Sequence, residues 1–323
     1  MSLNLFFRKY FAIALNILHL APRFWQDSSK YFVAVDYHYL AQKAIAYPTL
    51  EINREVLEKQ LHFIKENMNL INPKTYNDNF FKKNTSKKPS ILITIDDADC
   101  SIKENFDLFQ KYQIPIILFA PFGLCLDKNS RDGLMSRVFR SFNEINENKK
   151  ISLENKNNFF QKVANSSADE LRNILSELSH KRDNIDPIST RTLLTLEELK
   201  VMSLDPLVTI GSHSMSHPVL SSLPKEWLSW EIKTSIDYLN SVNGDKRYFA
   251  YPYGFKGATN FSVKNHLKNT GVRYAFSTRS MVVDKDSDNF ELGRIGMLNF
   301  FNKRYLNGLL GGAFEIFDKV LFR

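Results

Sequence analysis

The stretch VTIGSHSMSH, residues Val208 to His217, joins an apolar run to two histidines that stand four residues apart. Val208 to Ile210 has the composition of a buried strand, and the Gly-Ser pair that follows marks the strand end. On one turn of a helix, imidazoles with this spacing, here His213 and His217, can converge on a single metal ion. The same pattern also fits a helix start with two incidental polar residues, so a second signal is needed.

That second signal lies upstream in ILITIDDAD, residues Ile91 to Asp99, where Asp96 and Asp97 directly follow an apolar run. Adjacent aspartates alone are typical of a helix N-cap. One carboxylate with two imidazoles is, however, a frequent ligand set for catalytic Zn²⁺, and a second carboxylate can accept a proton from the activated water. Together the two stretches predict a site for a divalent metal, Zn²⁺ in particular, with a neighbouring base.

Segments with strand and helix patterns alternate along the chain, which predicts an α/β fold with parallel strands. Ligands of such sheets bind at the carboxyl ends of the strands, where both motifs stand. Thr195 and Glu198 form a capping-box pattern at one helix start. Strands are expected over 31–35, 91–95, 114–119, 208–210, 247–254 and 274–277, and helices over 52–71, 102–112, 195–204, 227–240 and 262–269.

A shift in composition marks residues 127–190, where Asn, Lys, Glu and Ser dominate and helical periodicity is weak. We expect a helical insertion there, between the acidic motif and the two histidines. It forms either a lid over the site or only a surface excursion. The main domain is expected over residues 31–300, with separate segments over 1–30 and 301–323.

Both terminal segments are apolar and basic. Residues 1–30 suit an amphipathic helix at a membrane surface, a helix packed on the domain, or a signal peptide. The apolar run within them is too short and too polar to span a bilayer. Residues 301–323 are a second candidate for peripheral membrane contact, or for packing against the first segment.

The bulk composition narrows the class of protein. Of 323 residues, 43% are hydrophobic and 24% are charged, as in ordinary globular proteins. The net charge of +8 is spread along the chain without zinc-finger or RNP-like motifs, so we expect no nucleic-acid partner. Only two cysteines occur, Cys100 and Cys125, which suits a reducing compartment. Cys100, close to the aspartates, has the pattern of a small buried residue more than that of a metal ligand.

From residue 31 to about 297 the sequence resembles the polysaccharide deacetylase family, with its NodB homology domain (carbohydrate esterase family four). The TFDDG motif of that family corresponds to Thr94–Ala98, its H-[ST]-x-x-H motif to His213–His217, and its P-Y-G motif to Pro252–Gly254. The segment FAYPYG and an early strand that ends in Tyr-His are similar to one branch of the family. The resemblance implies a distorted (β/α) barrel of about seven strands.

The resemblance also implies roles for individual residues, each at a position that matches a family motif. Asp96 is the expected base, and the backbone N–H of Tyr253 is expected to help bind the oxyanion. His38 is the candidate acid that protonates the leaving amine, although a strand-end histidine with a purely local hydrogen bond fits the same position. The expected metal ligands are Asp97, His213 and His217.

Three departures from the family pattern bear on these roles. Ala98 replaces the glycine after the aspartates, which matters if φ is positive there. Ala250 stands where better-known members have an arginine that orients the base, and Arg294 in LGRIG is the candidate substitute. We expect Arg294, like Tyr253, to face the substrate or its oxyanion. No Leu-x-x-His follows residue 277, so the usual C-terminal acid is missing.

The expected reaction is the hydrolysis of an N-acyl group, foremost N-acetyl, from an amino sugar of a glycan or of a glycolipid precursor that takes part in building cell-envelope glycans. Alternatives are a catalytically inactive carbohydrate-binding homologue and an O-acetyl esterase or deformylase with the same metal site. The expected location is the cytoplasm or the cytoplasmic face of the inner membrane, and an exported form stays open. The sequence does not indicate an oligomeric state.

Overall fold

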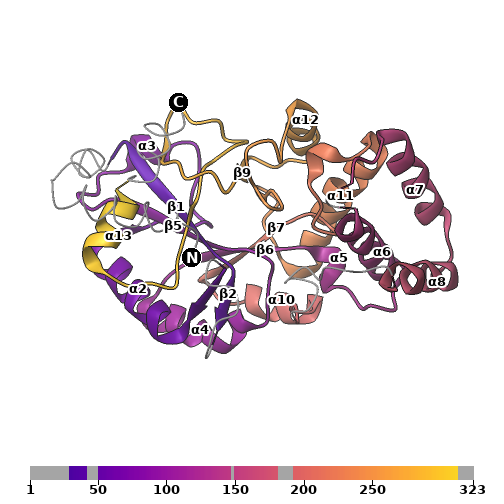
Figure 1. Cartoon of the computed structure of the whole chain (residues 1–323). Coiled ribbons are helices and arrows are strands. Elements are labelled where there is room, and N and C mark those ends of the chain that lie inside the picture. Colours follow the sequence, from indigo (N-terminus) through magenta and orange to yellow (C-terminus); the bar gives the residue numbers. More distant parts are fainter. Residues whose placement is uncertain (1–28, 42–49, 147–148, 181–191, 312–323) are drawn as a thin grey trace.

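The structure, a computed structural model, describes residues 29–41, 50–146, 149–180 and 192–311. Within this part of the chain the strands are β1 Tyr31–Tyr37, β2 Tyr39–Ala41, β3 Glu51–Asn53, β4 Asn69–Leu70, β5 Ser90–Ile95, β6 Ile116–Ala120, β7 Val208–Ser212, β8 Tyr248–Ala250, β9 Tyr274–Phe276, β10 Val283–Asp284 and β11 Ile295–Gly296. The main path of the central sheet runs β10–β1–β5–β6–β7–β8–β9 (Figure 1). The predicted barrel of about seven strands is confirmed as a curled half-barrel.

Parallel pairing brings the carboxyl ends of β5, β6 and β7 to one edge of the sheet. Ile93 lies opposite Ile116, and Ala120 lies opposite Ser212. Every residue of β5 is buried, which is why its sequence SILITI is a continuous run without polar alternation. This register places Asp96, directly after β5, at the same edge as the histidines after β7.

Alternate residues of the strands point to opposite faces and fill two separate cores. Ile93 and Leu118 belong to the face that packs on the surrounding helices. Phe119 and Phe276 lie on the other face, and their rings are 5.7 Å apart although β7 and β8 separate their strands, so this face is concave. A Cβ at Gly211 would stand 2.6 Å from the Phe119 ring, so only glycine permits this close approach.

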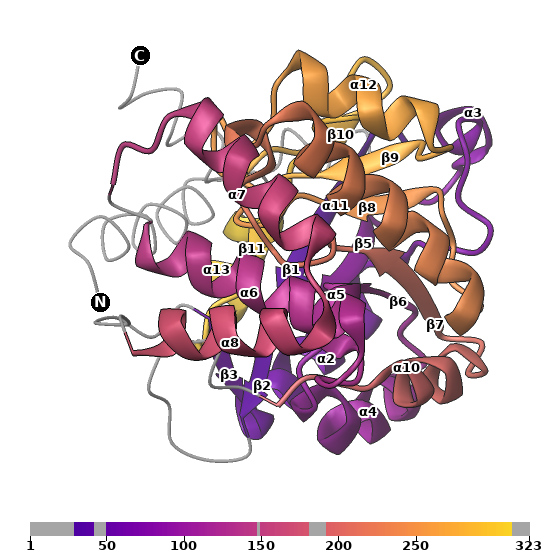
Figure 2. The same ribbon diagram turned by 90° about the vertical axis from the view of Figure 1, so that its right-hand side faces the viewer.

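Helices surround the sheet (Figures 1 and 2). In the described ranges they are α2 Arg54–Asn67, α3 Phe80–Lys83, α4 Ser101–Tyr112, α5 Phe122–Cys125, α6 Arg131–Ile145, α7 Leu153–Asn165, α8 Ala168–Ser179, α10 Leu196–Ser203, α11 Lys225–Tyr238, α12 Phe261–Asn269 and α13 Lys303–Leu310, with 3₁₀ turns η2 Leu220–Ser222 and η3 Leu239–Val242. The predicted capping box at the start of α10 is present.

The helix expected over 52–71 is shorter than predicted. Residues 51–53 pair with β2 as β3, and the Asn53 side chain then caps α2 by accepting from the N–H of Val56. At the other end, Asn69 and Leu70 pair with β5 as β4. Pairing with neighbouring strands therefore overrides helical periodicity at both ends of this segment.

The expected helical insertion consists of α6, α7 and α8, which Figure 2 shows together in front of the sheet. An aromatic cluster joins it to α11: the Phe139 ring lies 4.4 Å from that of Trp227, and Phe142 stacks on Phe159 at 3.9 Å. Weak periodicity over 159–163 and 171–178 indicated the last two helices but not α6. The insertion is thus packed on the domain, and its buried residues belong to the same hydrophobic core as the helix-facing side of the sheet.

The predictions for the two ends of the chain fall mostly outside the described residues, namely 1–28 and 312–323. Within the described part, α13 buries Tyr305 and Leu306. Just before it, the side chain of Gln60 in α2 donates to the carbonyl oxygens of Leu298 and Phe300. No helix among the described residues combines the length and the apolarity required to cross a membrane.

The aromatic cluster of the insertion can be tested by replacing Phe139 with alanine. Because this ring is fully buried and contacts both Trp227 and Phe160, Phe139→Ala is expected to lower the free energy of unfolding by about 3–5 kcal/mol. Guanidinium denaturation measures the change. Phe261→Ala is the matched control, since that side chain is 81% exposed and its loss should alter stability by less than about 0.5 kcal/mol. Equal effects of the two variants would contradict this packing.

Candidate metal centre

The two aspartates after β5 take different backbone conformations. The N–H of Asp96 still donates to the carbonyl oxygen of Tyr37, so this residue continues the strand. Asp97 and Ala98 then adopt left-handed φ values of 70° and 51°. This abrupt reversal leaves both carboxylates buried at the sheet edge, one as an extension of the strand and the other on the turn.

The histidines after β7 lie on an irregular loop, so the expectation of a helical turn is wrong. Positive φ values at Ser214 (67°) and His217 (60°) fold the loop. A buried carboxylate on α11, Glu231, accepts hydrogen bonds from the N–H groups of Met215 and Ser216 and from the Ser216 hydroxyl. These contacts, and not helix geometry, bring the two imidazoles together.

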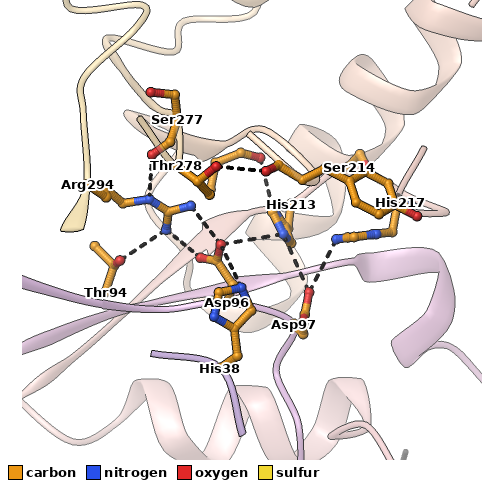
Figure 3. Close-up of polar contacts among 12 residues, drawn as sticks. His38, Thr94, Asp96, Asp97, His213, Ser214, His217, Ser277, Thr278 and Arg294 are labelled. Atoms are coloured by element: carbon orange, nitrogen blue, oxygen red, sulfur yellow. Dashed lines mark hydrogen bonds and ion pairs between the residues drawn. The ribbon is translucent and has the colours of Figure 1, made fainter. Parts of the chain in front are cut away.

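The side chains of Asp97, His213 and His217 form a buried triad (Figure 3). The Asp97 Oδ1 atom lies 3.5 Å from Nε2 of His213 and 3.3 Å from Nε2 of His217, and the three potential ligand atoms lie within 4.8 Å of one another. Burial alone would raise the pKa of Asp97, but hydrogen bonding to the two imidazoles outweighs it and holds the pKa well below its usual range. The triad therefore presents an ionised carboxylate and two ring nitrogens.

The other carboxylate, Asp96, is held by Arg294, whose side chain is fully buried. The guanidinium binds both carboxylate oxygens, with Nη1–Oδ1 at 2.6 Å and Nη2–Oδ2 at 2.7 Å (Figure 3). Its Nε donates to the carbonyl oxygen of Ser277 and its Nη1 to the Thr94 hydroxyl. Although burial raises the pKa of Asp96, the charges of Arg294 and His213 bring it below its ordinary value, so this carboxylate is ionised as well.

His38 approaches Asp96 from β1. Its Nε2 atom lies 3.9 Å from Asp96 Oδ2, and the side chain keeps 19% exposure. The Nε2 of His213 lies 3.8 Å from the same oxygen, so Asp96 Oδ2 stands between the triad and His38. Asp36 joins this side of the site, with ligand atoms of Asp36, His38 and Asp96 within 4.8 Å of one another. Burial raises the pKa of Asp36.

The PYG segment after β8 forms one rim of the site. Tyr253 has a φ of 63° and its ring, 38% exposed, lies 4.8 Å from the His217 ring. Gly254 follows with a φ of 57°, and a Cβ there would stand 2.5 Å from the backbone nitrogen of Thr278. Backbone conformation and space together therefore require glycine at this position.

Comparison with protein families matches residues 83–275 to the family described as polysaccharide deacetylase. The chain belongs to this family. The matched range contains both aspartates, both histidines and the PYG segment, whereas His38 and Arg294 lie outside it. No curated protein matches the chain significantly.

Solved structures of deacetylases share the fold. The Streptococcus pyogenes deacetylase PplD, in complex with acetate, is 17% identical with a TM-score of 0.60, over 87% of this chain and 98% of that one. IcaB from Ammonifex degensii is 17% identical with a TM-score of 0.57, over 88% and 97%. A de-N-acetylase from Aggregatibacter actinomycetemcomitans is 12% identical with a TM-score of 0.58, over 87% and 100%.

The triad suits the divalent metal that the deacetylase family implies. Asp97 Oδ1 is buried, and its polar neighbours are the two imidazole nitrogens, with which it could share a cation. Nδ1 of His213 lies 2.8 Å from the Ala250 carbonyl oxygen, which accepts the ring proton and leaves Nε2 as the ligand atom. His217 can ligate through Nε2 only with its ring proton on Nδ1, and this tautomer gives up the hydrogen bond that Nδ1 accepts from Arg140 Nη1, 2.9 Å away.

The departures from the family pattern have structural counterparts. Ala98 does occupy a positive-φ position, where the family glycine is less strained. Ala250 offers no cation to Asp96, and the guanidinium of Arg294 contacts that carboxylate instead. Cys100 lies outside the triad, with its thiol directed to the carbonyl oxygen of Thr192.

Sequence reasoning missed three residues at the site: Asp36, Glu231 and Arg140. Asp36 had a usable signal, because it precedes His38 by two positions at a strand end and such residues share a face. The other two lie on helices, far from the motifs in sequence. Glu231 bonds to residues 15 and 16 positions away, and Arg140 to a residue 77 positions away.

The anchoring of the histidine loop by Glu231 can be tested with Glu231→Gln. The glutamine keeps the shape but loses one acceptor oxygen for the N–H groups of Met215 and Ser216, so the free energy of unfolding should fall by about 2 kcal/mol. Chemical denaturation measures this loss. Glu226→Gln, at an exposed position on the same helix, should have almost no effect. A wild-type stability for Glu231→Gln would refute the anchoring role.

Proposed function

We propose that this protein is a metal-dependent hydrolase that removes an N-acetyl group from an amino sugar. One observation carries the proposal: a buried Asp-His-His triad lies beside a second ionised carboxylate, Asp96, that takes no part in the triad. Family membership supports a carbohydrate substrate. A site built only to bind a cation does not require the second carboxylate, whereas a hydrolytic site requires a base.

The chemistry follows from the positions of the residues. A divalent metal such as Zn²⁺, held by Asp97, His213 and His217, would supply Lewis acidity at the acyl oxygen and lower the pKa of water. Asp96 accepts the proton of the attacking water, because its carboxylate is ionised and directed by Arg294. The backbone N–H of Tyr253 serves the developing oxyanion. His38, on the far side of Asp96 Oδ2, delivers a proton to the leaving amine.

The competing functions differ in product. A catalytically inactive carbohydrate-binding homologue would bind metal and release no acetate. An O-acetyl esterase would release acetate without a free amine, and a deformylase would release formate. The bidentate Arg294–Asp96 contact favours an active enzyme, because it supplies the base with the arginine contact that Ala250 cannot provide. A lipid-linked glycan precursor at the cytoplasmic face of a membrane is the substrate that the basic, apolar terminal sequences favour.

The ligand set is tested by metal analysis together with a free-amine assay on N-acetylated glycan oligomers. His217→Ala should abolish both stoichiometric metal and amide hydrolysis, because two ligands rarely retain a catalytic metal. Asp96→Asn should retain the metal and lose hydrolysis, since the amide cannot accept the proton. Near wild-type hydrolysis by His217→Ala would rule out this ligand set. Metal binding by the wild type without any acetate, formate or amine would favour the inactive homologue.

The role of His38 is tested with His38→Gln. Loss of a general acid should lower kcat on the same oligomers by about 10²–10⁴-fold while metal content stays at the wild-type level. His266→Gln is the matched control, because His266 is half-buried on α12 and its Nδ1 bonds to the Ser262 carbonyl oxygen of its own helix. An undiminished kcat would leave His38 as a strand-end residue with a structural role.

A further inference from the structure

Arg140 connects the helical insertion to the candidate metal centre. It lies on α6 with a side chain only 4% exposed. Its Nη1 atom lies 2.9 Å from Nδ1 of His217, 3.2 Å from the carbonyl oxygen of His217 and 3.3 Å from the Tyr253 hydroxyl. The hydrolysis described above does not use this residue, yet it contacts both a metal ligand and the rim of the site.

The charge of Arg140 is balanced within its own helix. Its Nε lies 2.7 Å from Glu144 Oε1, one turn along α6, and both side chains are about 5% exposed. A buried, neutralised pair adds little net field to a cation site, so the guanidinium acts there mainly as an oriented donor. Its planar fork suits that task better than a flexible ammonium group does.

The two hydrogens of Arg140 Nη1 can be compared with the acceptors that are available when His217 binds a metal. This nitrogen carries two hydrogens and has three acceptors within 3.3 Å. A guanidinium only donates, so the 2.9 Å contact is a hydrogen bond while Nδ1 of His217 is unprotonated; when His217 ligates through Nε2, Nδ1 carries the ring proton and this bond is lost. The two remaining acceptors, the His217 carbonyl and the Tyr253 hydroxyl, then match the two hydrogens.

Packing of α6 on α11 fixes the position of Arg140. Phe139, its neighbour on α6, packs on Trp227, and the indole N–H of Trp227 donates to Glu231, the anchor of the histidine loop. The insertion and the histidine loop are therefore held by the same helix. Displacement of α6 would move Arg140 relative to His217.

We propose that Arg140 is a positioning residue of the metal centre, through which the insertion fixes the backbone of His217 and holds the Tyr253 ring against that imidazole. This inference rests on the proposed function, because it takes the triad to be the metal site. The insertion is then part of the site that holds the metal, in addition to forming a packed lobe.

The test measures metal binding without any substrate. The variant Arg140→Met with Glu144→Gln removes the donor without leaving a buried unpaired carboxylate. Calorimetric titration of the metal-free full-length protein with Zn²⁺ should show affinity about 10-fold or more below the wild type, as for other groups that orient metal ligands. The visible spectrum of bound Co²⁺ should also change, because the geometry of the His217 ligand changes. Arg140→Lys, which keeps one donor near the His217 carbonyl, should recover part of the affinity.

Arg137→Met is the matched control. Arg137 lies one turn earlier on α6 and donates to the backbone oxygens of Gly133, Leu124 and Leu126, away from the triad. It should lose stability but keep the wild-type Zn²⁺ affinity and Co²⁺ spectrum. Wild-type affinity and spectrum in the Arg140 variants would overturn the inference alone. Failure of the wild type to bind either ion would overturn the proposed function with it.

Discussion

The buried ion pair between Arg294 and Asp96 is the interaction on which the rest of the site depends. Two charged side chains have been removed from water, and this is tolerable only because every contact is satisfied: the guanidinium binds both carboxylate oxygens, the Ser277 carbonyl and the Thr94 hydroxyl. The pair joins residues 198 positions apart, next to β11, which pairs with β1. It therefore fixes the end of the sheet at which the triad is built and keeps Asp96 ionised.

The convergence of Asp97, His213 and His217 was predictable because both motifs follow the ends of strands. Parallel strands bring their carboxyl ends to one edge, so Asp97 and His213 had to lie close together once the alternation of strands and helices was recognised. The capping box at Thr195 follows from an equally local pattern, whereas the curled sheet was expected from the family resemblance. The conformation of the histidine loop was not predictable, because a spacing of four residues fits a helix as well as a loop held by Glu231.

Contacts made by residues on helices that are distant in sequence from the motifs could not be predicted in this way. Arg140 belongs to the stretch in which Asn, Lys, Glu and Ser dominate and helical periodicity is weak, and the neighbouring sequence does not indicate that Arg140 reaches the site. Its contacts depend on how α6 docks, and α6 docks through aromatic rings of α7 and α11 that no single stretch specifies. α11 thus has a double role, since Trp227 holds the insertion while Glu231 holds the loop.

Ala98 has a consequence for how the chain balances rigidity against stability. A left-handed alanine is less stable than a glycine at the same position by about 1 kcal/mol, and its neighbour Asp97 is left-handed too. A methyl group here also restricts the unfolded chain and narrows the range of torsions open to the turn. A protein with glycine at 98 would release conformational strain, yet its ligand carboxylate would sample more orientations. The turn is thus stiffer but its backbone is more strained. The buried surroundings of Ala98 are packed tightly enough to impose this strained conformation.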